Sequence, residues 1–545
     1  MRKIALTAVS LFLVVFVGDS FSQSFVEGRV WGIWEREHSP YILLDDIHIP
    51  PDSTLRIMPG VEIIAAGHFA IYVDSAASLK ALGTETDSII FTASYTSLGH
   101  LGIRFMKSAS GCSLAYWRIE YGRANLTTYL DLSSKGGAIF CYFADPFITN
   151  CNLINNSAMD GGGIYCYFSN PVILKNEITN NETYDGGGIF IFWSNPVVKD
   201  NIIANNRASY NGGGIYCNSS SPVIENNRII GNAPFYNGGG IFCANSSPTI
   251  KNNIIKGNSS CLGAGIFLTQ NSNATIANNL IYGNVSYCRG GGITCERSNP
   301  IVINNTICDN SAEIVGGGIC FSGRSKPVLV NNILYNNRAS SGNEIYLSYS
   351  ESEGIASQCS LFVAYCAVDP TECGADNNAG IILWRNGNIN MPPMFADSLY
   401  HLSPASPCID AGVDSFFIPE TEQTISAPET DLEQNPRPLG SAVDIGAFEF
   451  APTFIQNAKQ EVEPQTRLYA YPNPFNSSLK ITLTIPETEQ EPVAVYIFNL
   501  KGEKVFELSS SSGEWQPENN PGSGVYLVQA KIGNKRFVTK VVYAK

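Results

Sequence analysis

Three pairs of aromatic residues recur 25 residues apart, and each pair has the form aromatic-x-aromatic. Alternate residues of a strand point to the same side, so both rings of a pair should face the same way. A group of exposed flat rings usually marks a binding surface, and rings with polar neighbours suit the faces of sugars. The pairs are Phe140 and Tyr142, Tyr165 and Tyr167, and Phe190 and Phe192.

Two carboxylates follow the same spacing. Asp160 and Asp185 each stand directly before a glycine run, where they could contact a sugar or bind calcium. We expect no other cofactor and no transition-metal site, because the chain has five histidines and no Cys-x-x-Cys pair. Two alternatives stay open: a loop or the C-terminal domain covers the rings, or the rings only stabilise the face of a sheet.

The elements that would position these residues form a repeat. An isoleucine follows a glycine-rich run in nine copies, with steps of 25 to 27 residues: Ile139, Ile164, Ile189, Ile215, Ile241, Ile266, Ile293, Ile319 and Ile345. No heptad or helix-pair pattern lies inside the period. Short β-branched runs alternate with Gly, Pro and Asn, which predicts strands and turns. A period of this length therefore indicates a solenoid of short strands.

Two asparagine columns complete the repeat. Counted from the proline of each copy, the fifth residue is Asn in seven copies and the tenth is Asn in eight. Asparagine tolerates the left-handed backbone of a tight corner, and stacked copies can hydrogen-bond amide to amide. We interpret both columns as structural. They are Asn176, Asn201, Asn227, Asn253, Asn279, Asn305 and Asn332, and Asn156, Asn181, Asn206, Asn232, Asn258, Asn284, Asn310 and Asn337.

The glycine triplet, the Pro-x-Ile strand and the Asn corner resemble the right-handed parallel β-helix repeat family over most of residues 25–450. The resemblance implies an all-β fold, a right-handed parallel β-helix of three sheets with about 26 residues per coil. The expected divisions are an N-terminal cap with the first coils (23–130), regular repeats (131–349), and last coils with a C-terminal cap (350–450).

The fifteen cysteines do not form an obvious disulfide framework. Five of them lie two residues after the repeat isoleucine, where Ile, Leu and Phe stand in other copies, so they should act as small core hydrophobes. Cys261 and Cys288 instead share one phase in adjacent coils, a spacing that permits a disulfide. The five inward cysteines are Cys141, Cys166, Cys217, Cys243 and Cys295.

The two ends of the chain carry export signals. Arg2-Lys3 and a 14-residue apolar run predict a signal peptide over residues 1–22, and no later run is long enough to cross a membrane. After a polar linker (451–465), alternating strands predict a small Ig-like β-sandwich over 466–545. A formal net charge of −14 argues against nucleic acid as a partner.

The opening Tyr471-Pro472-Asn473-Pro474-Phe475-Asn476, with the later Gly-Val-Tyr-Leu strand, resembles the C-terminal (type A) sorting domain of type IX secretion substrates. That resemblance implies passage across the outer membrane by the type IX machinery. We therefore expect a secreted monomer, either extracellular or anchored at the outer-membrane surface.

Three function classes fit these features. A surface protein that binds glycans or mediates adhesion is favoured over an enzyme, because the repeats lack clustered acid and base groups. The second class is a polysaccharide lyase or glycoside hydrolase, and the third a purely structural protein. Four charged residues near the end could hold a cation or a catalytic centre, but ion pairs and turn hydrogen bonds are the favoured interpretation. They are Asp410, Asp431, Arg437 and Asp444.

Overall fold

The computed structural model describes residues 23–451 except 109–110, 125–130, 350–357 and 419–421. In the C-terminal part it describes 467–471, 478–484, 493–499, 501, 503–508, 512–517, 524–532 and 535–543. The chain divides into two compact units, residues 1–450 and 451–545, which we treat separately. The expected signal peptide and most of the linker lie outside the described residues.

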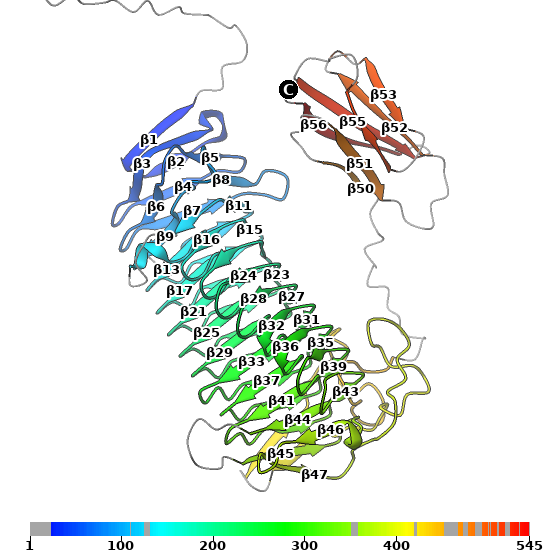
Figure 1. The fold of residues 1–545 in the computed structure, drawn as a ribbon. Helices are drawn as coiled ribbons and strands as arrows, with labels where there is room; N and C mark the ends of the chain where they lie inside the picture. The colour runs from blue at the N-terminus through cyan, green and yellow to red at the C-terminus, as the bar shows by residue number, and fades with distance from the viewer. Residues whose placement is uncertain are drawn as a thin grey trace, which may run out of the picture. The chain divides into compact units, whose positions relative to one another are not determined.

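The first unit is a solenoid of parallel strands stacked in register (Figure 1). A typical coil contributes one strand to each of three columns, and every strand pairs with its equivalent one coil away, as Ile164 does with Ile189. The predicted coil of strands is confirmed. One detail differs: β3 pairs with both β5 and β6, which joins the first and third columns in a single 25-stranded sheet.

The first strand column holds β3 (Tyr41–Ile49), β6 (Ala70–Val73), β9 (Gly102–Met106), β13 (Ile139–Tyr142), β17 (Ile164–Tyr167), β21 (Ile189–Phe192), β25 (Ile215–Asn218), β29 (Ile241–Ala244), β33 (Ile266–Thr269), β37 (Ile293–Glu296), β41 (Ile319–Ser322), β44 (Ile345–Ser348) and β46 (Cys373–Ala375). The second strand column holds β2 (Gly32–Trp34), β4 (Thr54–Ile57), β7 (Ser78–Leu82), β10 (Ser113–Ala115), β14 (Phe147–Thr149), β18 (Val172–Leu174), β22 (Val197–Lys199), β26 (Val223–Glu225), β30 (Thr249–Lys251), β34 (Thr275–Ala277), β38 (Ile301–Ile303), β42 (Val328–Val330), β45 (Cys359–Ala364) and β47 (Gly380–Trp384).

The third strand column holds β1 (Ser24–Arg29), β5 (Glu62–Ala65), β8 (Ile89–Ala93), β11 (Trp117–Glu120), β15 (Asn152–Ile154), β19 (Glu177–Thr179), β23 (Ile202–Ala204), β27 (Arg228–Ile230), β31 (Ile254–Lys256), β35 (Leu280–Tyr282), β39 (Thr306–Cys308) and β43 (Ile333–Tyr335), and it also pairs with β3. Short corner strands follow it: β12 (Arg123–Ala124), β16 (Ser157–Ala158), β20 (Glu182–Thr183), β24 (Arg207–Ala208) and β28 (Ala233–Pro234), then β32 (Ser259–Leu262), β36 (Val285–Arg289) and β40 (Ser311–Ala312). Three 3-10 turns, η1 (Arg36–His38), η2 (Leu132–Ser134) and η3 (Pro370–Glu372), complete the coils.

The aliphatic columns fill the interior. The repeat isoleucines and the residues two and seven positions after the prolines belong to one continuous core and are buried. Cys141, Cys166, Cys217, Cys243 and Cys295 lie in the same core, so the interpretation of these thiols as small hydrophobes is confirmed. Burial raises the pKa of the Cys141 and Cys217 thiols well above the ordinary value, which keeps them protonated and unreactive.

The asparagine columns form two hydrogen-bonded ladders through the corners. Asn206 is representative: its Nδ2 donates to Ile178 O at 2.9 Å and to Asn232 Oδ1 at 3.0 Å. Its Oδ1 accepts the backbone N–H and the Nδ2–H of Asn181, at 3.0 and 2.9 Å. Each buried amide therefore satisfies groups in the neighbouring coils on both sides.

The left-handed corner residue is one position earlier than the sequence predicts. Ladder asparagines do not have positive φ; the residue before each ladder position does, as Asn205 shows with φ +56°. Glycine takes that place in three coils, at Gly231, Gly257 and Gly283. The corner thus divides two tasks between neighbours, because the left-handed residue makes the turn and the next residue makes the ladder.

Replacing Asn206 by Ala should destabilise the solenoid by roughly 3 kcal/mol, because several buried groups lose their partners at once. Asn205→Gly is the matched control and should be nearly neutral, since Gly already occupies the equivalent position in other coils. Urea unfolding followed by tryptophan fluorescence would measure both; equal destabilisation by the two variants would contradict the ladder's role.

The last part of the first unit folds back along the solenoid. Residues 390–450, which we call the side cap, contain the hairpin β48 (Ser415–Ile418) and β49 (Gln423–Ser426). The side cap packs on two strand columns. Ile418 and Ile425 lie against the outer faces of β34, β38 and β42, and Leu402 and Ile445 lie against β39 and β43. In Figure 1 it is the olive-to-yellow group of loops beside β35 and β39.

The second unit is a small antiparallel β-sandwich, as expected. One sheet contains β50 (Arg467–Tyr471), β51 (Leu479–Thr484) and β54 (Ser512–Trp515), and the other β52 (Val493–Asn499), β53 (Lys504–Leu508), β55 (Gly524–Ile532) and β56 (Lys535–Tyr543). Their inner faces share one core that includes Ile481, Ile497, Trp515 and Val528.

Candidate ligand-binding face

The outer side of the first strand column carries the six predicted aromatic residues, in two columns. Phe140, Tyr165 and Phe190 stack with ring centroids 5.6 and 4.9 Å apart. Tyr142, Tyr167 and Phe192 form the second column, at 5.6 and 5.5 Å. The stacked coils therefore bring all six rings together on the side of the sheet that faces away from the core.

The expectation that all six rings are exposed is wrong for the first column. Phe140, Tyr165 and Phe190 are buried, and their stack continues into Tyr216, Phe242 and Phe267. The corner glycines explain the burial: a Cβ on Gly161 would lie 2.9 Å from the Cβ of Tyr165, so the corner backbone covers the base of each ring. Neighbouring rings cover the faces. Tyr142, Tyr167 and Phe192 remain half-buried.

A third column of rings, which was not predicted from the sequence, lies beside the second. Phe143, Phe168 and Trp193 lie in adjacent coils, with centroids 4.8 and 4.9 Å apart. Phe143 is 47% and Trp193 49% exposed. Lys107 precedes them in the same column, its Nζ 5.8 Å from the Phe143 ring centroid. The signal was present in the sequence, since each outer ring of a pair is directly followed by another aromatic residue in these three copies only.

These three aromatic residues adopt an unfavourable backbone conformation. Their φ angles are +49°, +47° and +46°, in the left-handed region that bulky residues rarely occupy. Other coils place Ser219, Asn245, Gln270, Arg297 or Gly323 at the equivalent turn. Large rings at this position are therefore not required by the fold.

Asp160 and Asp185 are not on the exposed surface. Both are buried in the corner before the glycines, and Lys135 Nζ forms an ion pair with Asp160 Oδ2. Asp185 Oδ1 accepts the N–H of Asn211 at 2.8 Å. A calcium ion would have to displace Lys135, so the predicted carboxylate or calcium contact is not supported by this geometry. Burial, together with a smaller contribution from the neighbouring Asp160, raises the pKa of Asp185 to about 7 against the opposing effect of the Asn211 N–H.

Asp185→Asn should stabilise the first unit by roughly 1–2 kcal/mol at pH 7.5. Because the folded-state pKa of Asp185 lies above its usual 3.8, wild-type stability falls as the pH rises from about 4 to about 7. The gain from the variant should grow over the same range and then level off. An Asn at 185 can also donate to Asp160 Oδ1, which has no partner among the described residues, as Asn237 Nδ2 donates to Asn211 Oδ1. Thermal unfolding at several pH values would measure the gain; a pH-independent or negative effect would contradict it.

Comparison with known proteins agrees with this geometry. A family model described as "Right handed beta helix region" matches residues 60–281 and 239–391, together more than half of the chain. The chain belongs to the right-handed β-helix family. The fold and handedness expected from the repeat are thus confirmed, and the solenoid is a right-handed β-helix. No curated protein matches the chain.

A second model, described as "Secretion system C-terminal sorting domain", matches residues 469–544. This β-helix protein is therefore a substrate of type IX secretion, exported to the cell surface or the extracellular space. Within the described residues, no helix is long and apolar enough to cross a membrane. Of the Tyr-Pro-Asn-Pro-Phe-Asn motif, only Tyr471 is among the described residues.

The cysteine pair of the β-helix lies on a corner. Cys261 and Cys288 form a disulfide with a Cα–Cα distance of 5.1 Å, joining β32 to β36. The Cys261 N–H donates to Tyr236 O, which places the pair in line with an exposed ladder of Tyr184, Tyr210 and Tyr236. The disulfide thus fastens two adjacent coils at the end of this ladder.

The four charged residues near the end of the β-helix form structural contacts. Arg437 Nε lies 3.1 Å from Glu449 Oε1, and both side chains are fully buried. Asp431 Oδ1 accepts the N–H groups of Glu433 and Asn435. Asp444 accepts the N–H of Asp410 at 2.7 Å, and Asp410 that of Ala442 at 2.9 Å. These carboxylates hold the turns of the side cap together, in line with the favoured interpretation.

The side cap also holds a histidine between two carboxylates. His401 Nδ1 lies 2.6 Å from Asp397 Oδ2 and Nε2 lies 3.2 Å from Glu433 Oε1. Its hydrogen bond with Glu433, supported by Asp397, raises the pKa of His401 to about 9 against the opposing effect of burial. The ring packs against Phe448, with centroids 4.5 Å apart.

The side cap should loosen as the pH rises through about 9. The folded-state pKa of His401 lies above its usual 6.5, so the stabilisation is fully present below about 6.5 and is lost as the pH passes 9. Hydrogen exchange of amides 397–403, corrected for intrinsic rates, should speed up over this range. His401→Gln should remove that pH dependence; if the variant retains it, another group is responsible.

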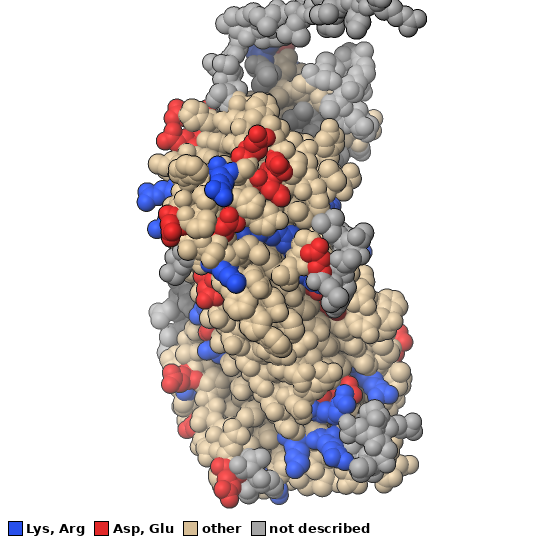
Figure 2. Space-filling model, turned by 90° about the vertical axis from the view of Figure 1, so that its left-hand side faces the viewer, with Lys and Arg blue, Asp and Glu red and all other residues tan. Residues whose placement is uncertain are grey.

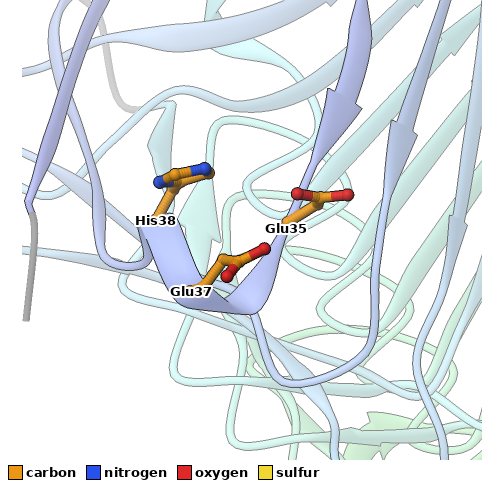
Figure 3. A group of neighbouring side chains, drawn as sticks. All are labelled: Glu35, Glu37 and His38. Carbon is orange, nitrogen blue, oxygen red and sulfur yellow. The ribbon is translucent and has the colours of Figure 1, made fainter.

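An acidic cluster lies in the opening coils (Figure 3). Glu35, Glu37 and His38 have ligand atoms within 4.8 Å of one another, and all three side chains are exposed. They belong to the η1 turn and the residue before it. Exposed acidic groups often gather in this way without a metal, and no second feature of the turn indicates a ligand.

Proposed function

We propose that this secreted β-helix protein binds glycans at the cell surface without catalysis, through the second and third aromatic columns. We call these six rings the aromatic face. Its members are Tyr142, Phe143, Tyr167, Phe168, Phe192 and Trp193.

The left-handed aromatic residues are the observation that carries this proposal. A non-glycine residue in this region costs roughly 1–2 kcal/mol. The fold does not need large rings there, because other coils use Ser, Asn, Gln, Arg or Gly, and two of the three rings are about half exposed. Strain retained at a solvent-facing position points to a functional role.

The chemistry of the aromatic face suits sugars. Adjacent coils repeat the rings at 4.8 to 5.6 Å, so the stacked rings form a continuous apolar strip on which the apolar side of a chain of sugar units can pack. In Figure 2 the side that carries the first strand column faces the viewer, and its middle is a broad area without charged side chains. A ligand of stacked, mostly neutral rings fits such a surface better than a polyanion does.

The charged residues of the repeats do not gather at the aromatic face. Glu225 lies between Lys199 and Lys251, at 3.4 and 3.5 Å, on the outer side of the second strand column. Lys175 and Asp200 lie on the corner after that column. Catalysis on a glycan needs an acid and a base on either side of one bond, so this distribution favours binding without turnover.

Binding of the mature chain to a glycan array tests the proposal. Trp193→Asn and Tyr167→Ala should each weaken binding at least about tenfold, as expected for loss of a stacking ring. Trp193→Asn removes a strained residue, so its unfolding midpoint should not fall, which separates loss of binding from loss of fold. Tyr210→Ala is the matched control, because Tyr210 is an exposed tyrosine on another corner, and this variant should bind normally. Unchanged binding by both face variants would exclude the aromatic face.

The same preparations distinguish the alternatives. Incubation with pectins, alginates and related polymers would release new reducing ends or unsaturated products if the protein is a hydrolase or a lyase. Turnover would contradict the non-catalytic proposal. Absence of both binding and turnover would instead indicate a structural surface protein.

A further inference from the structure

One corner of the β-helix forms a groove parallel to its axis. The left-handed residues between the second and third strand columns line it, with the first outward residue of each following strand. We call this the corner groove. Its left-handed residues are Asn150, Lys175, Asp200, Asn226, Asn252, Asn278, Asn304 and Asn331.

The last three of these residues bind the side cap. Asn331 Nδ2 donates to Val413 O at 2.8 Å, and Asn331 Oδ1 accepts the Val413 N–H at 3.0 Å. Asn304 Nδ2 donates to Asp444 O at 3.2 Å, and Asn278 Nδ2 to Thr430 O. Each amide thus pairs with the backbone of a different segment of the side cap.

Apolar contacts accompany these bonds. Leu280, the first residue of β35, packs with Ala447 and Phe448 of the side cap. One strand further on, Thr306 Oγ1 accepts the N–H of Ala447 at 3.0 Å. The groove therefore holds polypeptide by a repeated pair of features, a corner amide and a neighbouring strand residue.

The groove continues beyond the edge of the side cap. Asn226, Asn252 and Ile254 line an open cavity of about 270 Å³, whose other wall contains Leu432 and Phe448. The side-chain amides of Asn226 and Asn252 form no hydrogen bond with another described residue. A second cavity of about 310 Å³ follows along the same corner at Asn150, Lys175, Asp200 and Ile202.

We propose that the open part of the corner groove binds a largely apolar polypeptide segment of a partner protein, beside the edge of the side cap. Asn226 and Asn252 would donate to its backbone carbonyls, as Asn304 and Asn331 do within the side cap. Ile254 and the exposed Ile202 would take its apolar side chains.

The contacts of the side cap favour polypeptide over glycan. Asn331 matches the backbone of Val413 with one donor and one acceptor, which is how a side-chain amide recognises a peptide backbone. On the solenoid side the groove is lined by asparagines and a few aliphatic residues, with no aromatic ring among the described residues, and its charged residues are of both signs: Lys175, Glu177, Asp200, Arg228 and Glu433. The open part of the groove is continuous with the part that the side cap occupies. We therefore expect its ligand to be a polypeptide segment, as the side cap is.

A fluorescent peptide with the sequence of cap residues 442–450 is the probe, and anisotropy with the full mature chain is the measurement. We expect saturable binding that Asn252→Gly and Asn226→Gly each weaken about three- to tenfold, as for loss of one hydrogen bond. Glycine retains the left-handed turn, so these variants should fold normally.

Asn245→Gly is the matched control, because Asn245 is a left-handed asparagine on a different corner and should not affect the peptide. No saturable binding, or equal binding by all three variants, would overturn the proposal. Competition by oligosaccharides at the same site would identify a glycan groove instead. Sedimentation that shows a dimer lost on Asn252→Gly would assign the groove to a second copy of the chain.

Discussion

The buried asparagine ladders set the register on which every other feature depends. Each ladder amide hydrogen-bonds to the coil before it and the coil after it, so a shift of one residue in any coil would leave several buried polar groups without partners. Hydrophobic burial alone would not be as selective, because isoleucine, leucine and cysteine can exchange places in the core. Directional bonds therefore fix which residues align, and apolar burial stabilises the alignment.

Because the coils are aligned, residues with the same position in successive coils lie next to one another on the surface. Rings 25 residues apart become columns, and so do the corner residues of the groove. The same property produces buried carboxylates next to each other: Asp160 and Asp185 become neighbours only because the coils stack. The pair is tolerated since Lys135 neutralises one member and the other has a raised pKa.

The repeat made the fold, the inward cysteines and the ladders predictable, because each depends on the phase of a residue within the coil. The position of a residue within the coil does not show whether an outward-facing side chain is buried by other parts of the chain. Phe140 and Tyr142 both point away from the core, but only the first lies under the corner backbone that Gly136 permits. The left-handed residue was predicted at Asn206 but is Asn205. The two were confused because asparagine suits both a left-handed turn and a hydrogen-bonded ladder. A C-terminal cap was predicted within residues 350–450, but its packing along the side of the solenoid was not, since its contacts with Asn304 and Asn331 join residues more than 80 positions apart.

The ladders have a consequence for how such a protein can change in length. Every regular coil presents to the next coil the same donors and acceptors that it receives from the previous one. Duplication or loss of one whole coil would thus leave no polar atom unpaired, and would lengthen or shorten the solenoid by about 4.8 Å. The length of the solenoid can therefore change during evolution by one coil at a time, without changes to the residues at either end of it.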